Sequence, residues 1–257
     1  MNGSQADSAI SELVGLCRGF FGRRLISVVL YGSILFDDLA PGYGDLDFLA
    51  VVDGDLSDDD RRGLAELRRP LRGDASTVYE RMLEGAFLPR HMLDPARPGK
   101  AFWWGTSRER PWEKNDLGWL VLKVIRECGR VVYGQDVRGE APPPSPEQIL
   151  EDIRCFCRSA REHGRGGDLH AVDWLLSAAR LLLLLQEGRL SSKTEAAEWG
   201  RLHARGQWRE LLPQASHLRL NPREADSPDA RVWLAGLTPS IAEAVSELER
   251  ELARRQT

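Results

Sequence analysis

Basic residues are not in excess in this 257-residue sequence. Thirty-five Lys and Arg stand against 39 Asp and Glu, which gives a formal net charge of −4. A general nucleic-acid surface requires clustered positive charge, because phosphate contacts supply most of its affinity. Nucleic acid is therefore disfavoured as a partner.

Long apolar runs are also lacking. The most apolar stretch, Leu181 to Leu185, is five residues long and ends at Gln186 and Glu187, whereas a membrane span needs about 20 residues. The first ten residues, MNGSQADSAI, are polar where a secretory signal has a basic start and an apolar stretch. We therefore expect no membrane span and a cytoplasmic location.

Cysteine is scarce, and no two cysteines show the CxxC spacing of a zinc or redox motif. The four residues are Cys17, Cys128, Cys155 and Cys157. Cys155 and Cys157 would lie on nearly opposite sides of a helix. We expect all four to be reduced thiols.

The chain is long enough for two modest domains, each with its own core. The segment 138–148, RGEAPPPSPEQ, contains three consecutive prolines, which favour an extended spacer, and its Ser-Pro-Glu is a good helix start. We place a first domain at residues 1–141 and a second at 142–257.

Hydrophobic patterning in the first half predicts both helix and strands. Apolar residues at helical spacing predict a helix over 8–21. The segments LISVVLYG (25–32) and DLDFLAVV (45–52) are apolar or β-branched, as central buried strands are. A third strand is expected over 77–89, closed by Pro89.

The remaining patterning separates the two halves. The Pro-, Trp- and Arg-rich segment 89–115 predicts a long surface excursion, and 116–129 predicts a helix with Gly129 near its C-cap. Beyond the linker no strand is predicted, and a helical bundle is expected. Helical patterning covers 147–163, 169–187, 192–203 and 229–255.

Chemistry-bearing residues concentrate around the first two expected strands. Asp45 and Asp47 begin the second strand and are two residues apart, so they project from the same face. Two carboxylates this close repel, and magnesium, an oxygen-binding cation shared with substrate phosphates, relieves the repulsion. Gly32 and Ser33 end the preceding strand, where backbone and hydroxyl can approach a phosphate. The alternative is an acidic turn beside a tight corner.

Gly-Ser after one strand and Asp-x-Asp at the next resembles the nucleotidyltransferase superfamily signature. One departure is Gly44, which stands where many members have serine before the first aspartate. The segments WEKNDL (112–117) and ARLLLLLQEGRLSSKTEAAEW (179–199) resemble the aminoglycoside adenylyltransferases that modify streptomycin and spectinomycin. This resemblance implies an α+β protein: an N-terminal nucleotidyltransferase domain, with a mixed sheet and flanking helices, followed by an all-α helical bundle.

The resemblance also implies a third carboxylate, on a later strand, that acts as catalytic base. Glu80 and Glu84 are the candidates, expected on one face of the third strand. We prefer Glu84, because LEGAF resembles the family's Leu-Glu segment, whereas Glu80 has more polar neighbours. The alternative for either residue is a glutamate at the rim of an edge strand.

Further site residues are expected by the same resemblance. Lys193 matches a lysine that contacts the nucleotide phosphates, and the alternative is a solvated lysine at a helix start. Asp173 lies on a polar stripe of an otherwise apolar helix and would receive a cationic substrate, or else would form a buried network with Arg180 through Ser177. Trp112 would form a flat wall of the substrate site, or would be a plain hydrophobic anchor.

These expectations define one reaction. AMP passes from ATP to a hydroxyl of a small cationic polyol such as streptomycin or spectinomycin, bound between the domains of a monomer. Two magnesium ions are held by Asp45, Asp47 and Glu84, with Glu84 as base. Gly32, Ser33 and Lys193 position the phosphates. The alternatives are a related nucleotidyltransferase that modifies a protein side chain or RNA, and a non-catalytic binding module.

Overall fold

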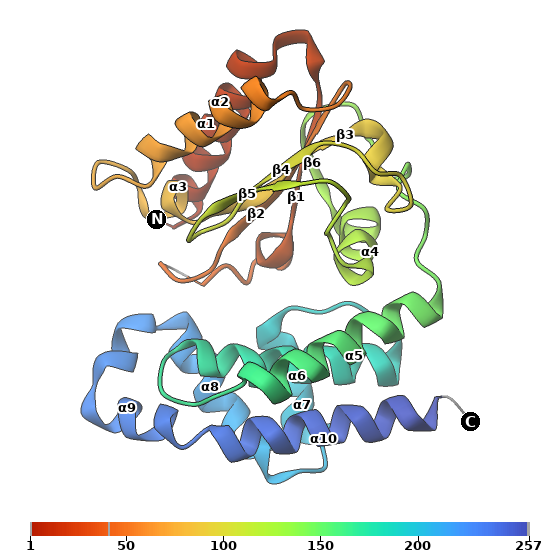
Figure 1. Ribbon diagram of the computed structural model, residues 1–257. Helices are drawn as coiled ribbons and strands as arrows, with labels where there is room; N and C mark the ends of the chain where they lie inside the picture. Colours follow the sequence, from red (N-terminus) through yellow and green to blue (C-terminus); the bar gives the residue numbers. More distant parts are fainter. Residues whose placement is uncertain (1, 41, 256–257) are drawn as a thin grey trace. The chain divides into compact units, whose positions relative to one another are not determined.

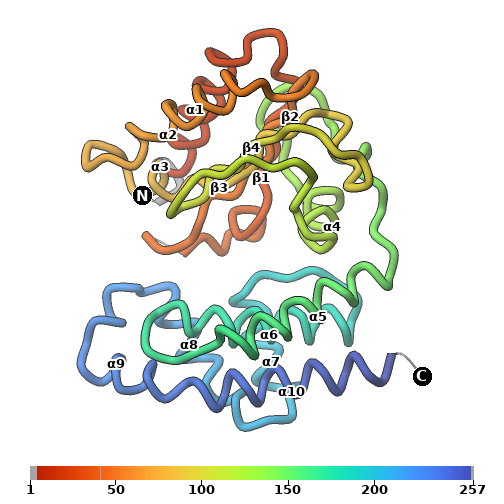
Figure 2. Tube along the Cα trace, in the orientation of Figure 1, coloured from red at the N-terminus to blue at the C-terminus, as the bar shows by residue number. Residues whose placement is uncertain are grey.

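The computed structural model describes residues 2–40 and 42–255, and the chain divides into two compact units (Figures 1 and 2). The first unit is Met1–Pro144 and the second is Ser145–Thr257. The division falls within the proline-rich segment 138–148. In the described parts of the chain, no helix is long and apolar enough to cross a membrane.

A six-stranded sheet in the order β5-β4-β3-β2-β1-β6 organises the N-terminal unit. Only β2 and β3 pair in parallel, and the other neighbours are antiparallel, so the sheet is mixed as predicted. The strands are β1 (Leu25–Tyr31), β2 (Leu46–Val52), β3 (Leu83–Pro89), β4 (Ala101–Trp104), β5 (Glu109–Trp112) and β6 (Arg130–Gly134).

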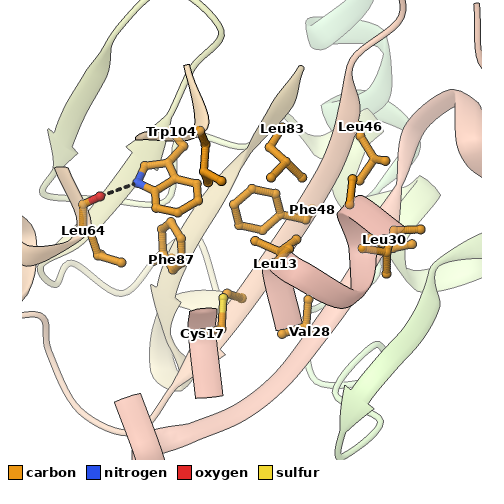
Figure 3. Close-up of a cluster of buried hydrophobic side chains, with 14 of the residues drawn as sticks. Leu13, Cys17, Val28, Leu30, Leu46, Phe48, Leu64, Leu83, Phe87 and Trp104 are labelled. Atoms are coloured by element: carbon orange, nitrogen blue, oxygen red, sulfur yellow. Dashed lines mark hydrogen bonds between the residues drawn. The ribbon is translucent and has the colours of Figure 1, made fainter. Parts of the chain in front are cut away.

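One face of this sheet carries the main apolar core. The helices α1 (Asn2–Phe21), α2 (Asp58–Leu71) and α3 (Val78–Arg81) contribute buried residues to it. Phe48, Phe87 and Trp104 pack edge to face at its centre, and the Trp104 indole N–H donates to the Leu64 carbonyl at 3.1 Å (Figure 3). Aromatic packing of this kind supplies large buried area and fixes the orientation of the sheet on the helices.

The opposite face is covered only in part by helix. The helix α4 (Trp119–Cys128) lies on the other side of the sheet from α1 and α2 and contacts β1 (Figure 1). Since side chains alternate along a strand, the residues next to Phe48 and Phe87 in sequence point to this second face. Asp47 and Glu84 therefore lie on this second face.

The structure corrects the strand expected over 77–89. Its first part is the helix α3, and the strand β3 begins only at Leu83. Thr77 caps this short helix: its side chain accepts from the Glu80 N–H, while the Glu80 carboxylate accepts from the Thr77 N–H. Reciprocal capping satisfies two helix N–H groups and outweighs the β-propensity of Thr77 and Val78.

The expected surface excursion over 89–115 is also wrong in part. It contains β4 and β5, which extend the sheet beyond β3, and the side chains of Trp104 and Trp112 are buried. The short strand β6, which pairs with β1, follows α4 and was not expected. Both additions depend on pairing with residues distant in sequence, which local patterning does not reveal.

The described residues of the C-terminal unit form helices joined by short loops, and no strand is among them. Its central helix is α6, which packs against α7, α8 and α10. The helix expected over 229–255 is two helices, since the chain turns at Gly236 and Leu237. The helices are α5 (Pro146–His163), α6 (His170–Glu187), α7 (Lys193–His203), α8 (Leu212–Leu220), α9 (Pro228–Ala235) and α10 (Thr238–Arg254). The predicted fold class, a mixed-sheet domain followed by a helical domain, is confirmed.

Candidate active site

The central strands place two carboxylates side by side on the second face of the sheet. Asp47 on β2 and Glu84 on β3 are direct partners in the parallel pair, and Tyr31 on β1 is the antiparallel partner of Asp47. Paired residues project from the same face of a sheet. Asp45 immediately precedes β2 and is partly exposed, as are Asp47 and Glu84. The structure therefore brings the three predicted carboxylates together at one end of the central strands, where β2 and β3 begin. We call this end of the strands the carboxylate edge of the sheet.

Negative charge accumulates at this edge. The pKa of Glu84 is raised to about 7 by burial first, and then by the charge of Asp45 and a hydrogen bond with it, while Arg68 and Arg110 oppose the rise. The pKa of the buried Tyr31 hydroxyl is raised well above its usual range by burial, and further by Asp47, Glu84 and Asp45. A proton on Glu84 or a bound cation would relieve this repulsion.

The donor chemistry of this edge suits magnesium. Among the described residues, no three or more His, Cys, Asp and Glu side chains are already grouped as a metal-holding cluster. Magnesium is usually held by one or two carboxylates together with substrate phosphates, so an all-protein cage is not required. Adjacent carboxylate oxygens are the kind of donors that this ion prefers.

Gly32 is required by the carboxylate of Asp47. The residue follows β1, has φ +77°, and begins a short 3-10 helix that includes Ser33 (Gly32–Phe36). A Cβ atom at Gly32 would lie 1.9 Å from Asp47 Oδ2. A side chain there would therefore displace the Asp47 carboxylate, a reason for glycine that adds to the phosphate approach inferred from the sequence.

We expect Gly32→Ala to reduce activity far more than it reduces stability. The left-handed backbone would cost the alanine variant about 1–2 kcal/mol of folding free energy. The larger effect is the shift of Asp47, since misplacing a reacting group by 1 Å costs about a hundredfold in rate. Steady-state turnover and urea unfolding, measured on the same preparation, test this. A variant with unchanged turnover would show that the contact with Asp47 is unimportant.

Glu80 lies away from this arrangement. Its carboxylate is occupied by the capping hydrogen bond from the Thr77 N–H, at 2.7 Å. Glu80 is in α3 and Glu84 in β3, so the expectation that they share one strand face is wrong. Of the two glutamates, the structure brings only Glu84 into register with Asp47.

The raised pKa of Glu84 predicts a pH-dependent difference in stability. Below about pH 4.5 the folded and unfolded chains both hold the Glu84 proton, and between there and about pH 7 the folded chain holds it more tightly. The stabilisation from this proton is therefore lost as the pH rises through 7. In metal-free buffer at pH 8, Glu84→Gln should have a higher melting temperature than the wild type. At pH 5 this difference in melting temperature should be absent. Equal differences in melting temperature at both pH values would contradict the raised pKa.

Trp112 is placed as a buried residue. It ends β5, is 4% exposed, and stacks on Trp103 with ring centroids 4.9 Å apart and planes 14° apart. The Arg110 guanidinium lies 5.6 Å from the Trp112 ring centre. Trp103 and Arg110 are cross-strand partners, and Trp103 also pairs with Ala86, two residues beyond Glu84. Alternation therefore puts this aromatic and cationic group on the same face as the carboxylates.

Trp103 and Arg110 were not identified from the sequence. Their shared face follows from β4 and β5, which were read as irregular surface chain. The signal available was the alternation of Arg110 with Trp112, but a run of four residues containing a proline is too short to indicate a strand by itself.

In the C-terminal unit, two predicted site residues contact each other. Lys193 begins α7, after the N-cap Ser192, and its Nζ lies 2.5 Å from Asp173 Oδ1 in the first turn of α6. Both side chains are about one quarter exposed, at 24% and 26%. Two residues that the sequence places at different ligands thus form an ion pair with each other.

The N-terminal unit brings together the residues on which the nucleotidyltransferase resemblance rests. A Gly-Ser pair follows β1, an Asp-x-Asp spans the start of β2, and a third carboxylate lies in register on β3. These residues share one edge of a mixed sheet whose opposite face is packed on helices.

Comparisons with known proteins agree with this class. Residues 145–250 match the family model described as aminoglycoside adenylyltransferase, C-terminal domain. The chain is also similar in fold to spectinomycin adenyltransferase from Enterococcus faecialis, solved with ATP and spectinomycin. The TM-score is 0.71, with 19% sequence identity over 94% of this chain and 98% of that one. A search of curated protein sequences gives no match. The predicted resemblance is confirmed for residues 145–250 by the aminoglycoside adenylyltransferase model, and for nearly the whole chain at the level of the fold.

Proposed function

We propose that this protein transfers AMP from ATP to a hydroxyl group of an aminoglycoside or aminocyclitol antibiotic, with release of pyrophosphate. The observation that carries the proposal is the register of Asp47 and Glu84 on parallel strands, next to Asp45 and the Gly32 turn. The family match of the C-terminal unit and the fold shared with a spectinomycin-modifying enzyme support the acceptor class.

The three carboxylates would all bind metal ions near the reacting phosphate, and one of them would also act as the base. Asp45, Asp47 and Glu84 would hold magnesium, and we propose two ions, which when bound supply charge neutralisation of the phosphates and of the attacking oxygen. Glu84 would accept the proton of the acceptor hydroxyl, since it lies in register with Asp47 beside the proposed metal donors. Gly32 leaves room for the Asp47 carboxylate, and Ser33 lies beside it at the end of β1, where its hydroxyl would donate to a phosphate.

The ion pair of the C-terminal unit would serve both substrates. Lys193 would contact the triphosphate as a compact positive charge, and Asp173 would receive an ammonium or guanidinium group of the acceptor. Trp103, which is partly exposed and stacks on the buried Trp112, would offer the acceptor an aromatic surface. We propose that a single chain suffices and acts as a monomer in the cytoplasm, where its co-substrate ATP is found.

Substitutions in the ion pair should separate the two substrates. Asp173→Ala should raise the Michaelis constant for the antibiotic at least about tenfold, the effect of losing about 1.4 kcal/mol, and should change that for ATP much less. Lys193→Ala should do the reverse. Initial rates of pyrophosphate release, with each substrate varied in turn, give the four constants. Equal effects on both substrates from either change would refute this division of roles.

The acceptor is tested with streptomycin and spectinomycin in the same assay. Release of pyrophosphate that depends on either antibiotic supports the proposal. If neither is modified while a protein or an RNA is adenylylated, the acceptor class is wrong and the nucleotidyltransferase chemistry remains.

A further inference from the structure

Arg68 is a buried cation that the reaction described above does not use. It lies on α2, is 0% exposed, and its guanidinium is 5.6 Å from the centre of the Trp104 ring. Nη1 donates to the Glu80 carbonyl at 2.7 Å, and Nη2 donates to the carbonyls of Arg81 at 2.8 Å and Leu83 at 2.7 Å. One side chain thus binds three backbone carbonyls at the end of α3 and the start of β3.

Burying a guanidinium costs desolvation free energy, and two properties of Arg68 reflect this cost. Burial is the main cause that lowers the pKa of Arg68 to about 10, and its Nε atom is buried without a hydrogen-bond partner. An apolar side chain could fill this position beside Trp104 without that desolvation, because buried ions are often replaceable by hydrophobic residues of similar volume. What an apolar residue could not supply is the set of charge-assisted hydrogen bonds to the three carbonyls.

Those carbonyls are where the chain approaches the candidate base. The Leu83 carbonyl belongs to the peptide group that joins Leu83 to Glu84, so Arg68 binds the main chain directly before the Glu84 Cα. The same three bonds fix the change from helix α3 to strand β3, which sets where the parallel pairing with β2 begins. A shift of one residue would send Glu84 to the opposite face of the sheet.

We propose that Arg68 is a positioning residue, which holds the junction of α3 and β3 so that Glu84 stays in register with Asp47. The inference rests on the proposed role of Glu84 and extends it to a residue on the opposite face of the sheet. Arg68 holds this junction through its bonds to the main chain, and its charge also opposes the rise in the pKa of Glu84.

The test compares Arg68→Lys and Arg68→Met with Leu64→Ala. Leu64 lies one turn before Arg68 on α2, is 1% exposed, and belongs to the same core. Its truncation should therefore lower stability without touching the junction. Rates are measured at a temperature at which circular dichroism shows each variant fully folded. We expect Arg68→Met to lower kcat at least about tenfold while the Michaelis constant for ATP stays within about threefold. Arg68→Lys should restore part of kcat, and Leu64→Ala should keep it within about twofold.

A second comparison separates positioning from general loosening. If Arg68 acts through Glu84, adding Arg68→Lys to Glu84→Gln should leave the residual turnover unchanged within about twofold, because changes that act through one group are not additive. If Arg68→Met does not fold, a kcat of Arg68→Lys below that of both the wild type and Leu64→Ala supports the inference, and a wild-type kcat of Arg68→Lys overturns it. Wild-type kcat in the folded Arg68 variants, or an equal loss of kcat in Leu64→Ala, would overturn the inference. Absence of turnover in the wild type would instead refute the proposed function.

Discussion

Replacement of Asp47 by asparagine is expected to reduce turnover at least about a thousandfold, with the fold retained. Asp47 lies between Tyr31 and Glu84 across the sheet, and its carboxylate fills the space left by the absent side chain of Gly32. Asparagine keeps the shape but removes one negative charge from the proposed metal donors. A loss of about 4 kcal/mol of transition-state stabilisation corresponds to a thousandfold in rate.

The matched control for Asp47→Asn is Asp53→Asn. Asp53 is exposed and follows the other end of β2, so it shares the strand but not the carboxylate edge. Turnover is measured by pyrophosphate release at saturating magnesium, with melting temperatures recorded for both variants. Turnover of Asp47→Asn within tenfold of the wild type would show that this carboxylate is not a catalytic ligand.

The second large effect is expected at Glu84. Glu84→Gln should lower the rate of adenylyl transfer about a hundredfold to ten-thousandfold, the range for loss of a general base, and ATP binding should stay within a few-fold. Glutamine fits the same position in β3 and removes only the ability to accept the proton and to carry charge. Binding of magnesium-ATP is measured by calorimetry and transfer by single-turnover kinetics.

Glu80→Gln is the internal comparison for this prediction. Glutamine can replace glutamate in a capping box, so the α3 cap should survive and activity should remain near wild type. An inactive Glu80→Gln together with an active Glu84→Gln would reverse the assignment of the base.

The strands that carry the carboxylates could be predicted because their signals are local. β1 and β2 are almost entirely buried, so they appear in the sequence as apolar runs, and Asp47 stands out near the start of one of them. The preference for Glu84 was reached through family resemblance, and its physical support, the register with Asp47, depends on pairing between β2 and β3. Register between distant strands is set by the packed sheet, and the sequence of one strand does not specify it.

Other features could not be read from local patterns. Arg68 stands in the charged run LRRPLR, which looks like a solvated helix face, yet it is fully buried. Lys193 and Asp173 are 20 residues apart, and they meet because the chain leaves α6 at Gly188, in the left-handed conformation, and turns back into α7. In both cases the partner is defined by tertiary packing.

The capping box at Thr77 and Glu80 is visible in the sequence, but the strand-favouring residues around it led to the wrong prediction for this segment. Thr-x-x-Glu is a recognised helix start, but the segment TVYERMLEGAF also contains β-branched and aromatic residues that favour a strand. In the structure this segment forms one turn of helix, α3, and then the strand β3, so both propensities are realised. The boundary between them is the point that Arg68 binds.

Mass spectrometry of the acceptor after incubation with ATP and magnesium tests the central claim most directly. Spectinomycin and streptomycin are each incubated with the wild type and with Glu84→Gln, and the products are analysed for a covalently added AMP. The account predicts that at least one antibiotic gains a single AMP with the wild type and almost none with Glu84→Gln. Unmodified antibiotics in the presence of a folded, ATP-binding wild type would contradict the proposed acceptor, and equal modification by both proteins would contradict the role of Glu84.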